Sequence, residues 1–277
     1  MEEVEILLSV ILFLIFIVVL FLIIVILGLS TLERVYAYFF DKPMVTYIHF
    51  PLKKLPQADV NFIKANFPFY NKLDVRKQQY FNHRVAFYLQ NKEFIGKENL
   101  VVTQDMKLRI SATAVMLTFG MRDYTLKRLE RFLIYPSIYY SNINHAYHKG
   151  EYNTRYKALI FSWQDLMKGF DVHNDNLNLA IHELMHVLQI NSYNNSSINA
   201  SLFKDYNQMI EEKLKNKAYR EKLVNSKYFR DYAFTNRFEF LAVLVENFIE
   251  TPQTFKEKFP FLYNDIKKML NFNFAGY

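Results

Sequence analysis

The spacing of apolar residues divides the chain into an N-terminal apolar run and a longer globular part. Residues Ile6–Leu29 read ILLSVILFLIFIVVLFLIIVILGL, which only Ser9 and Gly28 interrupt and which contains no charge. About 20 apolar residues span the hydrocarbon core of a bilayer as a helix. A cleaved signal peptide would begin with basic residues and have a shorter apolar stretch, whereas this chain begins MEEVE. We therefore expect a retained transmembrane anchor over residues 1–30.

The segment after the anchor, residues 31–56, is expected to be a tether, because Pro43, Pro51 and Pro56 interrupt regular structure. Residues 57–277 then form one globular domain. A first helix is predicted over residues 73–94, and a second is expected to begin after a Thr103 cap and to end at Gly120.

Three stretches of this domain are rich in β-branched and aromatic residues and predict strands: NLVVT at 99–103, RFLIYPSIYYS at 131–141 and RYKALIFSW at 155–163. From about residue 163 onward the spacing is mainly helical. A small sheet followed by helices predicts a mostly helical α+β domain. Trp163 and the strand KALIFSW, residues 157–163, could form the edge of a cleft that pairs with an extended peptide. For Trp163 itself, packing in the core is the favoured interpretation.

The charge pattern gives the anchor a predicted orientation. All 34 Lys and Arg residues follow residue 30, whereas three of the 27 acidic residues precede the apolar run. Basic residues collect on the cytoplasmic side, so the N-terminus is expected outside and the globular domain in the cytoplasm. The part after the run carries a net charge of +10, which suits an anionic inner leaflet. We find no nucleic-acid-binding motif.

The absence of cysteine excludes disulfides and thiolate ligands, so a metal site in this chain must use His, Asp or Glu. The segment NLAIHELMHVLQI offers such ligands on a helix predicted over Asn176–Ile190. His182 and His186 are four residues apart and therefore lie on one side of the helix, close enough to share one Zn²⁺. Glu183 lies beside them, where it could take a proton from a zinc-bound water.

A catalytic zinc site needs a third protein ligand. No histidine follows His186, so the third ligand is expected to be a carboxylate on the next strong helix, which is predicted over Asn236–Glu250. Glu239 and Glu246 lie seven residues apart on one face of that helix. Either could bind metal on this evidence, and a purely structural site with four ligands is a further interpretation.

The segments quoted above, together with DYAFTNRFEFLAVLVENFIETPQTFKEKFPFLYNDI, resemble the MtfA family of zinc-dependent peptidases over roughly residues 60–272. That family shares the plan of its catalytic domain with the anthrax lethal factor protease. The resemblance implies a zincin-like domain with zinc bound by His182, His186 and Glu239. It also implies that Glu183 is the general base and that Tyr232, seven residues before the third ligand, stabilises the oxyanion.

Two features depart from the family. Gln189 stands where members usually carry an aspartate, three residues after the second histidine, and such carboxylates orient metal-bound histidines. The anchor is the second departure, because the best-known members are soluble. Those members also bind a sugar-responsive transcriptional repressor, a role that no feature of this sequence supports.

These observations favour a membrane-anchored zinc metallopeptidase that faces the cytoplasm and hydrolyses peptide bonds of a peptide or protein substrate. The alternative is a regulatory zinc-containing module that binds a protein partner, such as a transcription regulator, with little or no turnover. The role of Glu246 stays open between support of a ligand histidine and simple half-burial.

Overall fold

The computed structural model describes residues 2–141, 145–172 and 174–277, and it separates into two compact units, Met1–Met44 and Val45–Tyr277. In the first unit, helix α1 (Glu2–Phe40) is long and apolar enough to cross a membrane. It continues through residues 31–40, which were expected to belong to the tether. Neither proline nor glycine occurs between Gly28 and Pro43, so nothing in the backbone stops the helix earlier.

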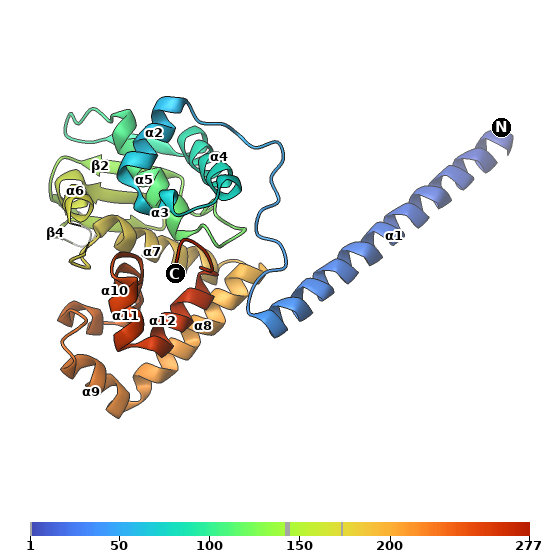
Figure 1. Ribbon diagram of the computed structural model, residues 1–277. Coiled ribbons are helices and arrows are strands. Elements are labelled where there is room, and N and C mark those ends of the chain that lie inside the picture. The colour runs from blue at the N-terminus through green and yellow to red at the C-terminus, as the bar shows by residue number, and fades with distance from the viewer. Residues whose placement is uncertain (1, 142–144, 173) are drawn as a thin grey trace. The chain divides into compact units, whose positions relative to one another are not determined.

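The second unit is mostly helical with a small sheet, which confirms the predicted fold (Figure 1). Its helices are α2 (Gln57–Asn66), α3 (Pro68–Asn71), α4 (Val75–Asn91), α5 (Gln104–Leu117), α6 (Trp163–Asp171), α7 (Leu179–Tyr193), α8 (Ile198–Lys215), α9 (Lys217–Asn225), the 3-10 helix η1 (Asp231–Phe234), α10 (Arg237–Glu250), α11 (Pro252–Lys258) and α12 (Pro260–Met269).

The main sheet has four strands in the order β1 (Glu93–Gly96), β2 (Arg131–Tyr135), β6 (Ala158–Ser162) and β5 (Gly150–Asn153). The first three are parallel, and β5 runs antiparallel to β6. Pro136 follows β2 and has no N–H for a ladder, so the predicted stretch 131–141 is divided. Its second part, β3 (Tyr139–Ser141), pairs with β4 (Ala146–His148) in a separate two-stranded sheet.

The predicted strand at 99–103 is wrong. The strand lies earlier, at β1, where the chain was expected to continue its first helix. Phe94 stacks on Phe132 of β2 with ring centroids 5.0 Å apart, which fixes β1 in the sheet. In the segment 99–103, Val101 is 80% exposed and Leu100 and Val102 pack against the core, but no strand pairs with it among the described residues. A Cβ at Gly96 would lie 1.8 Å from the carbonyl oxygen of Leu100, so the tight turn after β1 requires glycine.

Gly120 also acts differently from the expectation. Thr103 caps α5 as predicted, but the helix ends at Leu117 and Gly120 lies beyond it. A Cβ at Gly120 would lie 2.2 Å from the carbonyl oxygen of Leu270. Glycine is therefore needed because the C-terminal segment approaches the backbone there, and not because it caps the helix.

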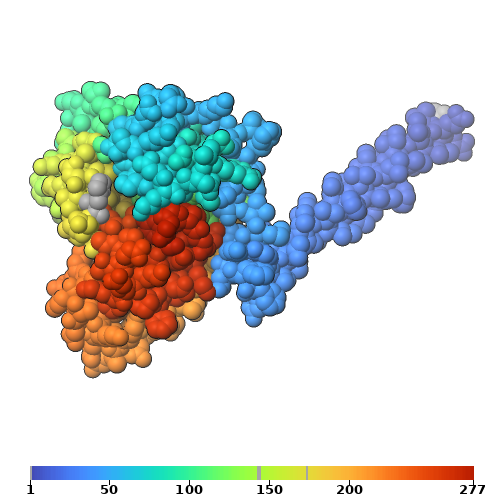
Figure 2. All heavy atoms as spheres, viewed as in Figure 1, coloured from blue at the N-terminus to red at the C-terminus, as the bar shows by residue number. Residues whose placement is uncertain are grey.

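Helix α7 lies at the centre of the second unit and packs against α5, α8, α10 and strand β5. In Figure 1 it runs between the half that contains the sheet and the half formed by α8 to α12. Figure 2 shows the C-terminal helices, in orange and red, covering the lower part of this face of the unit. Ala180, Leu184 and Val187 of α7 are fully buried, so the fold places this helix where both halves meet.

Residues 45–56, which we call the strap, are bound to the surface of the second unit. Arg122 donates to the carbonyl oxygen of Val45, and Tyr47 stacks on Tyr80 with centroids 4.8 Å apart. The backbone N–H of Lys53 donates to Nδ1 of His83 at 2.9 Å. The expected tether thus contains a segment with specific contacts to the domain.

The contact between the strap and His83 gives a prediction for pH dependence. His83 is 5% exposed, and burial, followed by the charges of His49, Lys53 and Arg84, lowers its pKa from 6.5 to about 4. Between these values the unfolded chain binds a proton that the folded chain does not. The free energy of unfolding should therefore decrease as the pH falls from 6.5 toward 4, by on the order of 1 kcal/mol from this group.

Urea unfolding of the full chain in detergent at several pH values measures this loss. His83→Asn keeps an acceptor for the Lys53 N–H but does not titrate, so its free energy of unfolding should vary less over the same pH window. Equal slopes for the two proteins would contradict the assignment.

Candidate active site

Helix α7 carries the predicted motif, and its start is set by Asn178. The side chain of Asn178 accepts a hydrogen bond from the backbone N–H of Ile181 at 3.1 Å, as an N-cap residue does. The helix was predicted from Asn176, but it begins at Leu179. Leu177, expected in the apolar stripe, precedes the helix and is 53% exposed.

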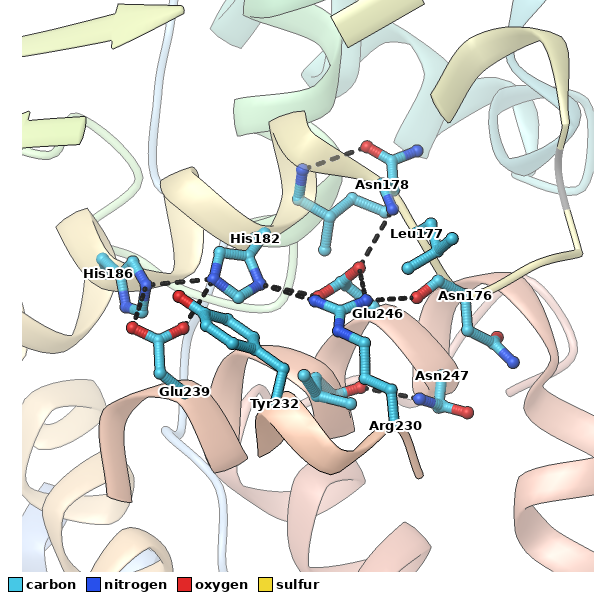
Figure 3. A network of polar contacts seen from close by, with 12 residues as sticks. Asn176, Leu177, Asn178, His182, His186, Arg230, Tyr232, Glu239, Glu246 and Asn247 are labelled. Atoms are coloured by element: carbon cyan, nitrogen blue, oxygen red, sulfur yellow. Dashed lines mark hydrogen bonds and ion pairs between the residues drawn. The ribbon is translucent and has the colours of Figure 1, made fainter. Parts of the chain in front are cut away.

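The three predicted ligand residues come together between α7 and α10. The ligand atoms of His182, His186 and Glu239 all lie within 4.8 Å of one another, and the group could hold a metal ion. Nε2 of His182 is 2.8 Å from a carboxylate oxygen of Glu239 and 3.2 Å from Nε2 of His186. The other Glu239 oxygen is 3.5 Å from His186 Nε2. Figure 3 shows these side chains pointing toward one another from the two helices.

The start of α10 places Glu239 at this point. The side chain of Asn236 accepts hydrogen bonds from the backbone N–H groups of Phe238 and Glu239, at 2.8 and 3.1 Å, and so caps the helix. Glu239 therefore stands in the first turn of α10. Tyr232 precedes it on η1, and its ring centroid lies 6.0 Å from that of His182.

Glu246 contacts the other nitrogen of His182, one of the predicted ligand residues. One of its carboxylate oxygens is 2.7 Å from Nδ1 of His182, and Arg230 forms a two-pronged ion pair with the same carboxylate at 2.7 and 3.0 Å (Figure 3). Hydrogen bonds of this kind fix the orientation and tautomer of a metal-binding histidine. Glu246 is 1% exposed, so it is fully buried rather than half-buried, and it contacts His182 from within the core.

Gln189 takes the corresponding place beside the second histidine. Its amide oxygen is 3.1 Å from Nδ1 of His186, so the ring N–H can donate to it. The amide nitrogen lies 3.5 Å from the carbonyl oxygen of Phe238, at the start of α10. The amide thus retains the orienting contact but lacks the negative charge of the aspartate that it replaces.

Charges in the site favour the binding of a cation. Burial lowers the pKa of His182, but hydrogen bonds to Glu239 and Glu246 outweigh this effect and raise it to about 9. Burial raises the pKa of Glu239, but hydrogen bonds from His182 and His186 bring it well below its usual value. Both shifts have the same cause, since buried carboxylates surround the imidazoles and stabilise positive charge between them.

A pocket of about 570 Å³ opens beside the cluster. Its walls include His182, Glu183, Tyr232 and Arg230, and it extends past strand β5. Glu183 is only 7% exposed, and burial raises the pKa of its carboxyl group. The charges of His182 and His186 act in the opposite direction and lower this pKa, but burial has the larger effect. Tyr232 is 51% exposed, and burial of its hydroxyl end and the nearby Glu239 raise its pKa to about 12.

Strand β5, rather than β6, forms the edge of the main sheet at this pocket. The expectation that Trp163 and residues 157–163 supply the edge is wrong, because β6 pairs with β2 on one side and β5 on the other. Gly150 at the start of β5 approaches Glu183 so closely that a Cβ would lie 2.5 Å from Glu183 Cγ. Sequence reasoning missed Gly150 and Arg230, since a glycine in a loop-rich stretch and an arginine before η1 carry no local signal.

Comparisons with known proteins identify relatives of this chain. Residues 47–270 match the sequence profile of the family described as glucose-regulated metallo-peptidase M90. An uncharacterized protein of Synechocystis is 26% identical over 227 residues, which cover 73% of this chain and 78% of that protein. A protein of Serratia proteamaculans named Mlc titration factor A is 24% identical over 73% of this chain and 82% of its own length. The protein of that name from Yersinia pestis is 24% identical over 72% and 78%.

Proposed function

This chain belongs to the glucose-regulated metallo-peptidase family M90, and on that basis we propose that it is a membrane-anchored zinc metallopeptidase. The observation that carries the proposal is the convergence of His182, His186 and Glu239 within 4.8 Å, beside a pocket that a peptide can enter. Two imidazoles and one carboxylate are a ligand set typical of catalytic zinc, which leaves a position open for water. We propose zinc as the bound ion on this ground.

Zinc held by these three residues would supply a Lewis acid that lowers the pKa of a water molecule and polarises the scissile carbonyl. Glu183 takes the proton from the attacking water and returns it to the leaving amine. The Tyr232 hydroxyl, whose raised pKa keeps it protonated at neutral pH, donates a hydrogen bond to the oxyanion that develops. Glu246 and Gln189 orient the two ligand histidines.

The substrate is proposed to be a peptide segment in extended form. Within the described residues, strand β5 has a neighbour in the sheet only on the β6 side, and its first residue, Gly150, lines the pocket. An extended peptide that pairs with the other edge of β5 would pass Gly150 and bring one of its peptide bonds to Glu183.

Gly150→Ala tests whether this close approach positions the base. The new Cβ would lie 2.5 to 2.6 Å from three atoms of Glu183, so the carboxylate must move. A displacement of about 1 Å at a reacting group can cost on the order of 10²-fold in rate. We expect kcat to fall by roughly that factor, with KM and bound zinc nearly unchanged. The matched control is Gly28→Ala, where a Cβ meets nothing within 4 Å. Unaltered kcat in Gly150→Ala would contradict the role.

A regulatory function is the second candidate, because two relatives are named for titrating a factor called Mlc. In that case the same domain binds a protein partner, and turnover is weak or absent. The two candidates differ in their dependence on Glu183, which a catalytic site requires and a binding surface does not.

The anchor is proposed to be the apolar run within α1, with the peptidase domain, including residues 57–277, in the cytoplasm. Support comes from the helix that is long and apolar enough to cross a membrane and from the basic residues that follow it. A reporter that works only in the cytoplasm, fused to the C-terminus, should be active. Activity of a reporter that works only outside the cell would show that the proposed orientation is wrong.

Metal content and hydrolysis, measured on one preparation of the full chain in detergent, test the central proposal. We expect about one zinc per chain and cleavage of members of a broad peptide library, with both lost on chelation and restored by zinc. A preparation that holds zinc but cleaves no peptide would contradict the peptidase function and favour the regulatory function.

A further inference from the structure

The outer face of the strap, residues 45–56, combines exposed apolar side chains with lysines. Phe50 is 96% exposed and Ile48 is 59% exposed. Lys53 and Lys54 follow them, and no acidic residue occurs between residues 42 and 58. A large aromatic side chain with almost its whole surface in water is unfavourable, and its combination with basic residues is typical of surfaces that bind membranes.

The inner face of the strap holds these residues in place. Tyr47, His49 and Leu52 alternate with the exposed positions, and each is partly buried against the domain. The His49 and His83 rings lie 4.8 Å apart, and Arg122 holds the carbonyl of Val45. Ile48 and Phe50 therefore lie on a segment that is already held in place by the domain. Binding of these two side chains to a surface would cost little conformational entropy, because few residues become ordered.

The position of the strap in the sequence indicates its partner. Helix α1 ends at Phe40, only ten residues before Phe50, so the two residues are at most about 35 Å apart. The last turns of α1 carry Tyr36, Tyr38, Phe39 and Phe40, and aromatic residues in such positions favour the membrane interface. A bilayer crossed by α1 is thus always within reach of the strap.

We propose that the outer face of the strap docks on the anionic bilayer surface, with Phe50 and Ile48 at the boundary between headgroups and acyl chains. Lys53 and Lys54 then lie among the phospholipid headgroups, where each favours binding to anionic lipid. A hollow of about 490 Å³ lined by Phe50, both lysines and Gln79 offers room for a headgroup. The inference rests on the proposed anchor, and its consequence is that the catalytic domain faces the membrane in one orientation.

The absence of cysteine allows a probe to be placed at one position of the full chain. Phe50→Cys and Phe261→Cys form a matched pair, because Phe261 of α12 is also an exposed phenylalanine, at 77%. Each variant is labelled with a polarity-sensitive fluorophore and reconstituted in vesicles of phosphatidylcholine with or without phosphatidylglycerol. We expect blue-shifted emission and quenching by lipid-borne quenchers at position 50 in the anionic vesicles, and water-like emission at position 261.

The lysines supply a quantitative test. Replacing Lys53 and Lys54 with glutamine should lower the equilibrium constant for docking by roughly 30-fold. The same fluorescence measures this constant. The control is the pair Lys217→Gln and Lys227→Gln, whose side chains are 91% and 72% exposed on another part of the domain. This control should leave the signal unchanged.

Flotation of the vesicles separates the possible failures. If the chain does not float with vesicles, the proposed anchor is wrong. If it floats and the probe at position 50 stays water-like in anionic vesicles, the docking surface is wrong while the anchor stands. Blue-shifted emission at position 50 that depends on protein concentration and occurs equally in detergent would overturn lipid docking in favour of a second copy of the chain.

Discussion

Glu183→Gln is expected to lower turnover by about 10²–10⁴-fold, while the content of bound zinc and the stability of the fold stay near those of the wild type. The substitution keeps the size of the side chain and the helix that carries it. It removes the carboxylate that accepts the proton of the attacking water. The ligand atoms of His182, His186 and Glu239 are not altered, so the metal should remain.

Steady-state hydrolysis of the best library peptide, with zinc measured on the same sample, checks this result. Glu212→Gln, which changes a half-exposed carboxylate on α8, is the control and should behave like the wild type. A cellular phenotype that survives Glu183→Gln unchanged, together with a wild-type chain that cleaves nothing, would make the regulatory function the better explanation.

The second large effect, on zinc binding and turnover, is expected from a change at Glu239, the proposed third ligand. Glu239→Ala should lose most of the bound zinc and, with it, all measurable turnover, because two imidazoles alone hold the ion weakly. Glu246→Gln should instead weaken zinc affinity by about 10- to 100-fold without changing the stoichiometry at saturation, since Glu246 contacts His182 Nδ1 and not the ion. The two glutamates thus give different results, although they stand on the same helix.

Zinc titration with a competing chelator distinguishes the two variants. Full stoichiometry and affinity in Glu239→Ala would place the third ligand elsewhere, and Glu246 would be the first residue to examine. Circular dichroism of both variants shows whether α10 is retained, so that a loss of metal is not mistaken for unfolding.

The proximity of His182 and His186 could be predicted from the sequence because α7 places residues four apart on one side by its own geometry. For the predicted third ligand, the residue pattern alone left two glutamates on one face of α10, and only the family resemblance indicated Glu239. The choice between them depends on the packing of α7 against α10, which brings Glu239 to Nε2 of His182 and Glu246 to Nδ1 of the same ring. No local pattern contains that information.

Secondary structure was predictable where apolar residues repeat with a clear period. It was less predictable where contacts between residues distant in the sequence determine the conformation of a segment. Strand β1 was missed because it directly follows α4 and holds its place by stacking of Phe94 on Phe132, far away in the sequence. The prolines of the strap predict irregular structure, and therefore a tether. The order of the strap comes from Tyr80, His83 and Arg122, and these contacts become visible only once the domain is folded.

Helices α7 and α10 are joined by contacts that use none of the proposed zinc-binding atoms. The backbone N–H of Asn178 donates to Glu246 at 2.9 Å, and the Asn178 side-chain amide donates to Glu250 at 3.0 Å, while Gln189 reaches Phe238 near the other end of the pair. Small zinc domains are unfolded until the ion binds, but this pair of helices has its own means of association. The ion should therefore enter and leave a folded chain, and its binding adds to stability only by mass action. A chain that has lost the ion would then keep its fold and could take up zinc again, so that the proposed activity could be restored without synthesis of a new chain.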